Sequence, residues 1–277
     1  MTRFAACFLT VFGQLAFGGM LGLAVPPFFK VERGFYKSTA GVYLSSALIT
    51  AAGFALLALR ANPFHHPAPY VLWISAAVWT AFAAVSAAYL VTLWSDNGWR
   101  RARSYASALA VGLIAVVLTS VPMRQPDFGA TAAVFYALTA VTSSMVLGLV
   151  SGAMMFGHWY LIDPNLPVDY LRDFVRLLGQ ALVLDIAVMM LVPPCLWLAG
   201  GAARAAIVTL VDSHWLLLAA RMILGPVATL ILTWMTWQTL KVPQTMAATG
   251  LLYIAVMAAL VGEMLGRFIL FRTAVPL

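Results

Sequence analysis

The sequence predicts an all-α fold: a polytopic membrane helix bundle that forms one integral membrane domain, residues 1–277, with eight transmembrane helices. Two features of the composition predict it. Of the 277 residues, 63% are hydrophobic and only 9% are Asp, Glu, Lys or Arg, against roughly 25% in ordinary soluble domains. The mean hydropathy is +0.95 for a mass of 29.8 kDa. A soluble protein of this size needs more charged residues to cover its surface. Most of the surface of this chain must therefore face lipid.

Several other classes of protein are excluded. The apolar runs are continuous, whereas the strands of a membrane β-barrel alternate. Two cysteines are too few for a secreted disulfide scaffold. The net charge is +7, but the bases stand one to three at a time between apolar runs and form no patch for nucleic acid. The chain has no Walker sequence, Gly-rich dinucleotide turn or CxxC, which argues against nucleotide hydrolysis and iron–sulfur ligation by this chain.

The predicted spans follow from length and hydropathy, because a crossing needs about 20 mostly apolar residues. Eight stretches qualify: Phe4–Pro26, Ala40–Leu59, Tyr70–Trp94, Tyr105–Met123, Ala130–Ile162, Leu177–Gly200, His214–Leu240 and Met246–Leu270. The fifth is too long for a straight crossing, so we expect its C-terminal end to extend beyond the hydrocarbon. The first is too long for a signal peptide and ends in Pro26-Pro27 without a small-residue cleavage pattern, so we interpret it as a retained helix.

The Lys and Arg residues predict the orientation, because basic loops stay in the cytoplasm. The loops after spans one, three, five and seven hold nine bases, and the opposite side holds six, including Arg267. We therefore expect both termini outside and the chain in the inner (cytoplasmic) membrane. Tryptophans near the span ends, such as Trp94, Trp159 and Trp215, match the aromatic belts of membrane proteins.

Five polar residues fall inside the predicted spans, where an ionisable group costs at least about 2.5–3.5 kcal/mol. They are Gln14, Asp185, Arg221, Glu263 and Arg267. At a rise of 1.5 Å per residue, Arg221 and Glu263 both lie about 10 Å below the outer boundary. Glu263 and Arg267 are also i, i+4 neighbours on one helix face. This pattern predicts a salt bridge among the three, and leaves open whether it is structural or also serves proton or quinone chemistry.

Asp185 is predicted about 12 Å from the inner boundary, a depth at which the spans hold no cation. We expect it to be protonated, or to pair with Arg172 or Arg176 reaching in from the preceding loop. A buried structural acid and a functional proton carrier are both consistent with this position.

The four histidines form no pair suited to haem. His158 ends span five on the inner side, His214 opens span seven on the outer side, and His65 and His66 lie in the outer loop after span two. A bis-histidine haem needs two ligands at one depth on facing helices, so we expect no metal on this chain. His158 is interpreted either as a hydrogen-bonding residue at the membrane boundary or as a contact to a quinone headgroup or a partner subunit.

The segment His158–Gln180 mixes aromatic, proline and charged residues more densely than any other part of the chain. Asp163-Pro164 predicts a turn, and Val168–Arg176 predicts a short interfacial helix. The segment is either a solvated connector or a docking surface for a soluble partner on the inner face.

Residues near both ends of the chain resemble a known family. Span one contains the run Thr10–Gln14 followed by Gly18-Gly19, and span eight contains Gly262–Arg267 followed by Phe271. Both resemble the first and last helices of the membrane-anchor subunit of dimethyl-sulfoxide-reductase-type complexes, which belongs with the polysulfide-reductase-type quinol anchors. That family has a similar length, eight spans and both termini outside. Its His-Leu-Gly-x-Pro pattern after helix two and its membrane acid near helix three are absent here.

The resemblance implies a quinone-interacting subunit that binds menaquinone or ubiquinone non-covalently and holds no metal. It would pass electrons between the quinone pool and an iron–sulfur subunit, which serves a catalytic subunit, often with molybdenum, in anaerobic respiration. The candidate quinone-binding or proton-path residues are Gln14, His65, His66, Arg221, Glu263 and Arg267, with His158 and Asp185 as inner-side candidates; none is expected to be catalytic. The alternatives are a small-molecule transporter, which the lack of an inverted repeat disfavours, and a structural subunit of a respiratory or photosynthetic complex.

Overall fold

The computed structural model describes residues 2–61, 69–123, 125–242 and 244–277. In these ranges the chain is helical, with eight helices long and apolar enough to cross a membrane, so the predicted fold class is confirmed. The long helices are α1 (Thr2–Gly22), α2 (Arg33–Arg60), α3 (Pro69–Thr92), α4 (Gly98–Ser120), α5 (Gly129–Trp159), α6 (Val168–Ala199), α7 (Gly201–Met222), α8 (Ala228–Lys241) and α9 (Thr245–Thr273). Three short elements join them: η1 (Val121–Met123), η2 (Pro126–Phe128) and the π-helical η3 (Ile223–Val227).

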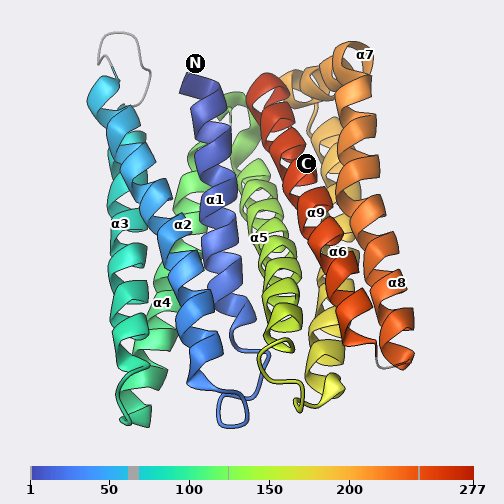
Figure 1. Ribbon diagram of the computed structural model, residues 1–277. Helices are drawn as coiled ribbons and strands as arrows, with labels where there is room; N and C mark the ends of the chain where they lie inside the picture. The colour runs from blue at the N-terminus through green and yellow to red at the C-terminus, as the bar shows by residue number, and fades with distance from the viewer. Residues whose placement is uncertain (1, 62–68, 124, 243) are drawn as a thin grey trace.

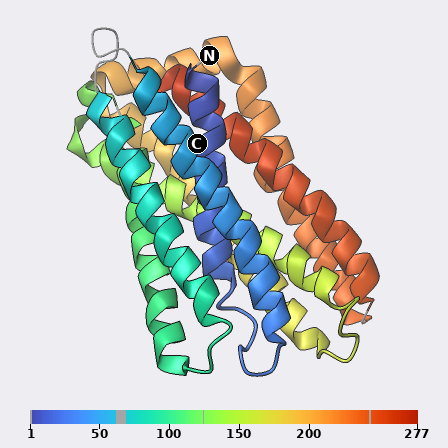
Figure 2. The same cartoon turned by 60° about the vertical axis from the view of Figure 1, so that its left-hand side comes forward.

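The seventh span is built from three of these elements. The first part of α7, up to Ser213, lies across one end of the bundle in both views (Figures 1 and 2). The helix bends at His214, whose φ of −133° and ψ of 20° are not helical. The rest of α7 then continues through η3 into α8 and crosses the bundle. The predicted start of this span at His214 therefore coincides with the bend.

The predicted interfacial helix Val168–Arg176 is wrong as a separate element, because α6 runs without a break from Val168 to Ala199. The stretch Val168–Leu178 contains no glycine or proline, so nothing in the chain ends the helix at Arg176. Its first turns also pack against α8: Arg172 donates from Nη2 to the Leu240 carbonyl oxygen over 2.8 Å. This contact satisfies a backbone carbonyl in the last turn of α8, which has no partner within its own helix.

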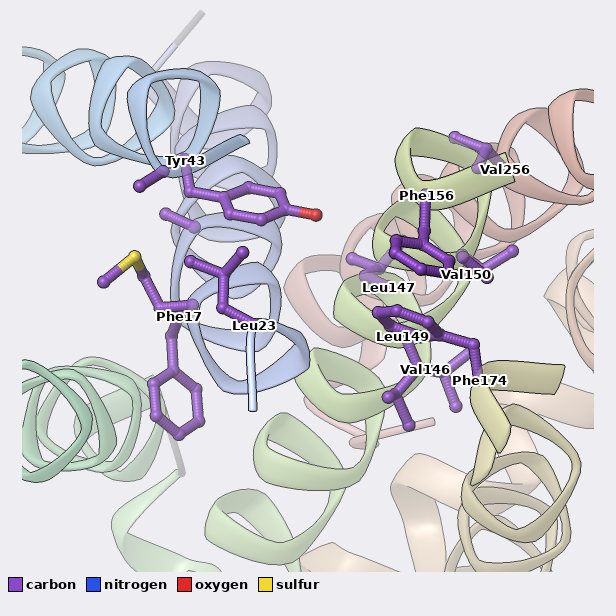
Figure 3. Close-up of a cluster of buried hydrophobic side chains, with 14 of the residues drawn as sticks. Phe17, Leu23, Tyr43, Val146, Leu147, Leu149, Val150, Phe156, Phe174 and Val256 are labelled. Carbon is purple, nitrogen blue, oxygen red and sulfur yellow. The ribbon is translucent and has the colours of Figure 1, made fainter. Parts of the chain in front are cut away.

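Helices α1, α5 and α9 lie side by side at the centre, with α2–α4 on one side and α6–α8 on the other (Figures 1 and 2). The closest approach joins α1 to α5, where a Cβ added to Gly148 would lie 1.9 Å from the carbonyl carbon of Gly18. Only glycine fits both backbones at this crossing, as in other small-residue contacts between membrane helices. Figure 3 shows part of the buried apolar cluster, with side chains of α5 together with Phe17 from α1 and Phe174 from α6.

The bundle has two distinct ends. We call inner the end that carries the connections after α1, α3, α5 and α8, and outer the end where α1 begins and α9 ends (Figure 1). Arg267 does not belong to the outer surface, as the base count assumed, because it is 1% exposed and lies inside the bundle. Without it the bases number nine on the inner side against five on the outer side. By the same measure the buried Arg101 leaves the inner count, so the inner excess stays at three bases, eight against five, and the cytoplasmic orientation of the inner end stays a prediction.

Candidate functional site

Three of the predicted site residues meet in one buried ion cluster. Arg221 Nη2 lies 2.6 Å from Glu263 Oε1, and Arg267 Nη2 lies 3.4 Å from Glu263 Oε2. All three side chains are at most 3% exposed. The pairing expected from their depth and spacing is therefore present, with one carboxylate between two guanidinium groups.

Glycines make room for the Arg221 side chain against α9. A Cβ at Gly262 would lie 3.0 Å from Arg221 Nη1 and 2.3 Å from the Gly225 Cα atom, and one at Gly266 would lie 2.8 Å from Arg221 Nε. The spacing of Gly262 and Gly266, one helical turn apart, thus leaves a path for the guanidinium beside Glu263. The sequence analysis noted these glycines as a family pattern and missed this steric role.

The cluster extends to a second acid, Asp185 of α6, through two hydroxyl groups of α5. Thr142 Oγ1 donates to Asp185 Oδ1 over 2.5 Å, and Ser143 Oγ lies 3.5 Å from the same oxygen. Ser143 Oγ also accepts a hydrogen bond from Arg267 Nη2 over 3.4 Å. We call Asp185, Arg221, Glu263 and Arg267 the four-charge cluster. Two acids and two arginines make it formally neutral, which is how ionisable groups are usually kept in a membrane interior.

The structure corrects the predicted position of Asp185. It is not isolated on the inner side, because it accepts a hydrogen bond from Thr142 and lies 3.5 Å from Ser143, which in turn contacts Arg267. The error came from the span boundary at Leu177. Since α6 begins at Val168, Asp185 lies about 25 Å along the helix and near its middle.

Some polar atoms of the site lack partners among the described residues. They are Nε of Arg221, Nε of Arg267 and Oε1 of Gln14. A buried polar group without a hydrogen bond costs about 1–3 kcal/mol. Gln14 does use its amide nitrogen, which donates to the Ala140 carbonyl oxygen of α5 over 3.3 Å. The free donors of the two arginines are suited to a ligand that accepts hydrogen bonds.

An apolar cavity of about 230 Å³ lies between α6 and α7, next to the four-charge cluster. Its lining includes Met189, whose sulfur is 3.7 Å from Arg221 Nη2. Leu277 also lines the cavity. It is buried beside Gly266, and Arg221 Nε lies next to the same glycine. The cavity therefore comes within one side chain of the Arg221 guanidinium.

Backbone irregularity is concentrated beside the cluster. The π-helical η3 begins two residues after Arg221 and contains Pro226, and both Gly225 and Pro226 are buried. Single π-helical turns within α-helices occur frequently at functional sites. Here the turn lets Gly225 approach α9 at Gly262 while Arg221 reaches Glu263.

The remaining predicted residues do not join the cluster. His158 Nδ1 lies 3.3 Å from the Tyr253 hydroxyl on an exposed face at the inner end, so His158 is a hydrogen-bonding residue at the boundary. His214 lies at the bend of α7 at the outer end. His65 and His66 lie outside the described residues. Gln14 is buried, with its amide nitrogen bonded to α5 three residues before Ser143.

Comparisons with protein-family models, curated proteins and solved structures find no match to this chain.

Proposed function

We propose that this multi-pass membrane protein is the quinone-reactive anchor subunit of a respiratory electron-transfer complex. In this role it exchanges electrons between menaquinone or ubiquinone and an iron–sulfur partner subunit, which serves a catalytic subunit such as a molybdenum enzyme. The observation that carries the proposal is the four-charge cluster, in which the unbonded Nε of Arg221 lies one side chain away from an apolar cavity. Quinone chemistry needs this combination of an apolar slot, a hydrogen-bond donor at a carbonyl oxygen and carboxylates that can exchange protons.

The arrangement of α1 and α9 supports the same proposal. The two segments that resemble the quinol-anchor family are at opposite ends of the sequence, and they contribute Gln14, Glu263 and Arg267. Both segments pack against α5 in the fold, where Gln14 contacts Ala140 and Arg267 contacts Ser143. A shared location is what a common functional origin of the two segments would produce.

Each residue has a distinct role in this proposal. Arg221 donates from Nε to a quinone carbonyl oxygen, and its Nη2 stays bonded to Glu263. Glu263 exchanges the proton that accompanies electron transfer. Ser143 and Thr142 connect Arg267 to Asp185, the second acid that can hold a proton. In the direction of quinol oxidation, a quinol would give up two electrons and two protons as it becomes a quinone. The electrons would pass to the iron–sulfur partner, because this chain is proposed to hold no metal.

The test is purification of the tagged chain from its native membrane in mild detergent, followed by quinone extraction and iron analysis. We expect quinone and an iron–sulfur protein to copurify. An Arg221→Lys variant keeps the charge but loses the planar guanidinium fork, so it should retain less quinone. The matched control is Arg204→Lys, an exposed arginine on the same helix. Equal quinone in both variants would contradict the site, and a wild-type preparation with neither quinone nor an iron–sulfur partner would contradict the function.

The alternative of a structural subunit is favoured by the near-complete pairing of the cluster. It predicts that substitutions at the cluster lower assembly of the complex without changing the turnover of the complexes that form.

A further inference from the structure

A second buried arginine lies at the inner end, away from the four-charge cluster. Arg101 of α4 is 8% exposed. Its Nη1 makes one long hydrogen bond, 3.4 Å, to the Ser95 carbonyl oxygen, and its guanidinium stacks 4.0 Å from the centre of the Phe28 ring. No ion pair joins it to a described carboxylate, and Asp96 is already paired with Arg33 at 2.8 Å. Arg101 is therefore a buried cation without an anion.

Arg101 lines a cavity of about 410 Å³ between the loop after α1 and the inner ends of α2, α3 and α4. Three tyrosines share the lining. The hydroxyls of Tyr36 and Tyr105 donate to backbone carbonyls at 2.8 and 2.7 Å. The Tyr89 hydroxyl has no hydrogen-bond partner in the described part of the chain, and Tyr89 lines the cavity together with Arg101. The cavity thus offers free donors and no carboxylate.

The surroundings of this cavity are strongly basic. Two segments at the inner end, the loop after α1 with the start of α2 (27–40) and the loop after α3 with the start of α4 (93–105), hold six bases and two acids. The bases are Lys30, Arg33, Lys37, Arg100, Arg101 and Arg103, and the acids are Glu32 and Asp96. Gly98, in the first turn of α4, also lines the cavity. The N-terminal end of a helix carries a partial positive charge, so this turn adds to the attraction for an anion.

A second, apolar cavity adjoins the Arg101 cavity at Ala24. Ala24 lines both the Arg101 cavity and a second cavity of about 360 Å³. The second cavity runs along α1, α5 and α6, and its apolar lining includes Leu21, Val25, Met145, Leu149, Leu177 and Leu184. A polar site at the membrane boundary that adjoins an apolar groove has the shape and polarity of a lipid headgroup with its acyl chain.

We propose that these two cavities bind one anionic phospholipid of the leaflet at the inner end, whose phosphate accepts hydrogen bonds from Arg101 and Tyr89 and whose acyl chain lies in the groove beyond Ala24. Basic pockets between membrane helices on the cytoplasmic side are a known mode of recognition for anionic headgroups. The excess of bases favours a charged phosphate over a neutral quinone headgroup. The lipid would join the loop after α1 to the start of α4. This proposal does not depend on the proposed function.

The experiment is native mass spectrometry of the full chain in detergent, titrated separately with phosphatidylglycerol and phosphatidylcholine. Both lipids carry a phosphodiester, but phosphatidylcholine adds a choline cation that the surrounding bases repel. We therefore expect the wild-type protein to prefer phosphatidylglycerol by about tenfold. Arg101→Gln should lose this preference. The control Arg100→Gln removes an exposed charge next to it and should keep the preference.

Further variants keep the proposal falsifiable if Arg101→Gln does not fold. Tyr89→Phe removes only a hydroxyl and should weaken phosphatidylglycerol binding several-fold. Ala24→Trp fills the junction of the two cavities and should weaken binding of a long-chain lipid more than that of a short-chain analogue. Equal affinity of the wild type for both lipids, or equal losses in Arg100→Gln and Arg101→Gln, would overturn the proposal. The proposal would also be overturned if inorganic phosphate alone displaced phosphatidylglycerol. The same holds if the bound molecule that the Arg101→Gln variant loses were a quinone and not a lipid.

Discussion

Replacing Glu263 with glutamine tests the centre of the four-charge cluster. Glutamine keeps the shape of the side chain and can still accept a hydrogen bond, but it removes the negative charge and the exchangeable proton. In the wild type Glu263 contacts Arg221 at 2.6 Å and Arg267 at 3.4 Å, with every side chain at most 3% exposed. The variant leaves Asp185 as the single acid for two buried arginines.

The expected cost follows from this imbalance. Removing one partner of a buried ion pair typically costs about 3–5 kcal/mol, because the remaining charge has no compensation. Arg221 loses the negative charge on the acceptor of its shortest hydrogen bond, and Met189 Sδ at 3.7 Å is its other contact. Arg267 keeps Ser143 at 3.4 Å. We therefore expect a clear loss of stability that falls mainly on the contact between α7 and α9.

The assay measures two quantities: the amount of assembled complex, and quinol oxidation per assembled complex as a function of pH. If Glu263 exchanges protons, turnover per complex should fall about 10²- to 10⁴-fold, as for other general acid–base residues, and its pH dependence should change. The control is Asp212→Asn, which removes an exposed carboxylate on α7. Normal turnover in the Glu263→Gln complexes that assemble would refute the proton role and leave a structural ion pair.

Three further predictions concern topology, packing and cofactors. A reporter fused after Leu277 should be periplasmic, because the basic loops lie at the inner end; a cytoplasmic signal would reverse the orientation. Gly148→Ala should lower the free energy of unfolding in detergent by about 1–3 kcal/mol, since its Cβ would meet the Gly18 backbone at 1.9 Å. Gly250→Ala, where a Cβ has no atom within 4 Å, should be neutral or stabilising, and equal effects would contradict the packing argument. The isolated chain should show no haem band in a reduced-minus-oxidised spectrum, and a retained band would disprove the interpretation of its histidines.

The helix boundaries show the limits of hydropathy. The sequence places all eight spans, but it begins span two at Ala40 and span six at Leu177, whereas α2 begins at Arg33 and α6 at Val168. Hydropathy detects the part of a helix that lies in lipid. Backbone hydrogen bonds continue through polar residues until a turn or a proline ends them, so helices extend beyond the apolar run.

The candidate site was partly predictable for a similar reason. Glu263 and Arg267 are one turn apart, and Arg221 is at the same depth on the preceding span, so periodicity and rise were enough to predict their meeting. Asp185 was assigned to the inner half of its span, away from the cations, because its depth was counted from Leu177, nine residues after the start of α6. Gly225 had no signal of its own, since its role depends on a contact with Gly262 of another helix.

The sequence by itself determined that this chain is a bundle of eight membrane helices, because the composition and length of apolar runs depend only on local residues and on the thickness of the bilayer. It also determined that charges inside the bundle must be paired. The tertiary structure decided how the buried charges are paired: Asp185 reaches Arg267 through Ser143, while Arg101 is buried and no ion pair joins it to a carboxylate in the part of the chain that the structure describes. These outcomes depend on which helices are neighbours. Helix neighbours are chosen by the fit of small residues across the bundle, such as Gly18 against Gly148, and one-dimensional periodicity does not contain that information.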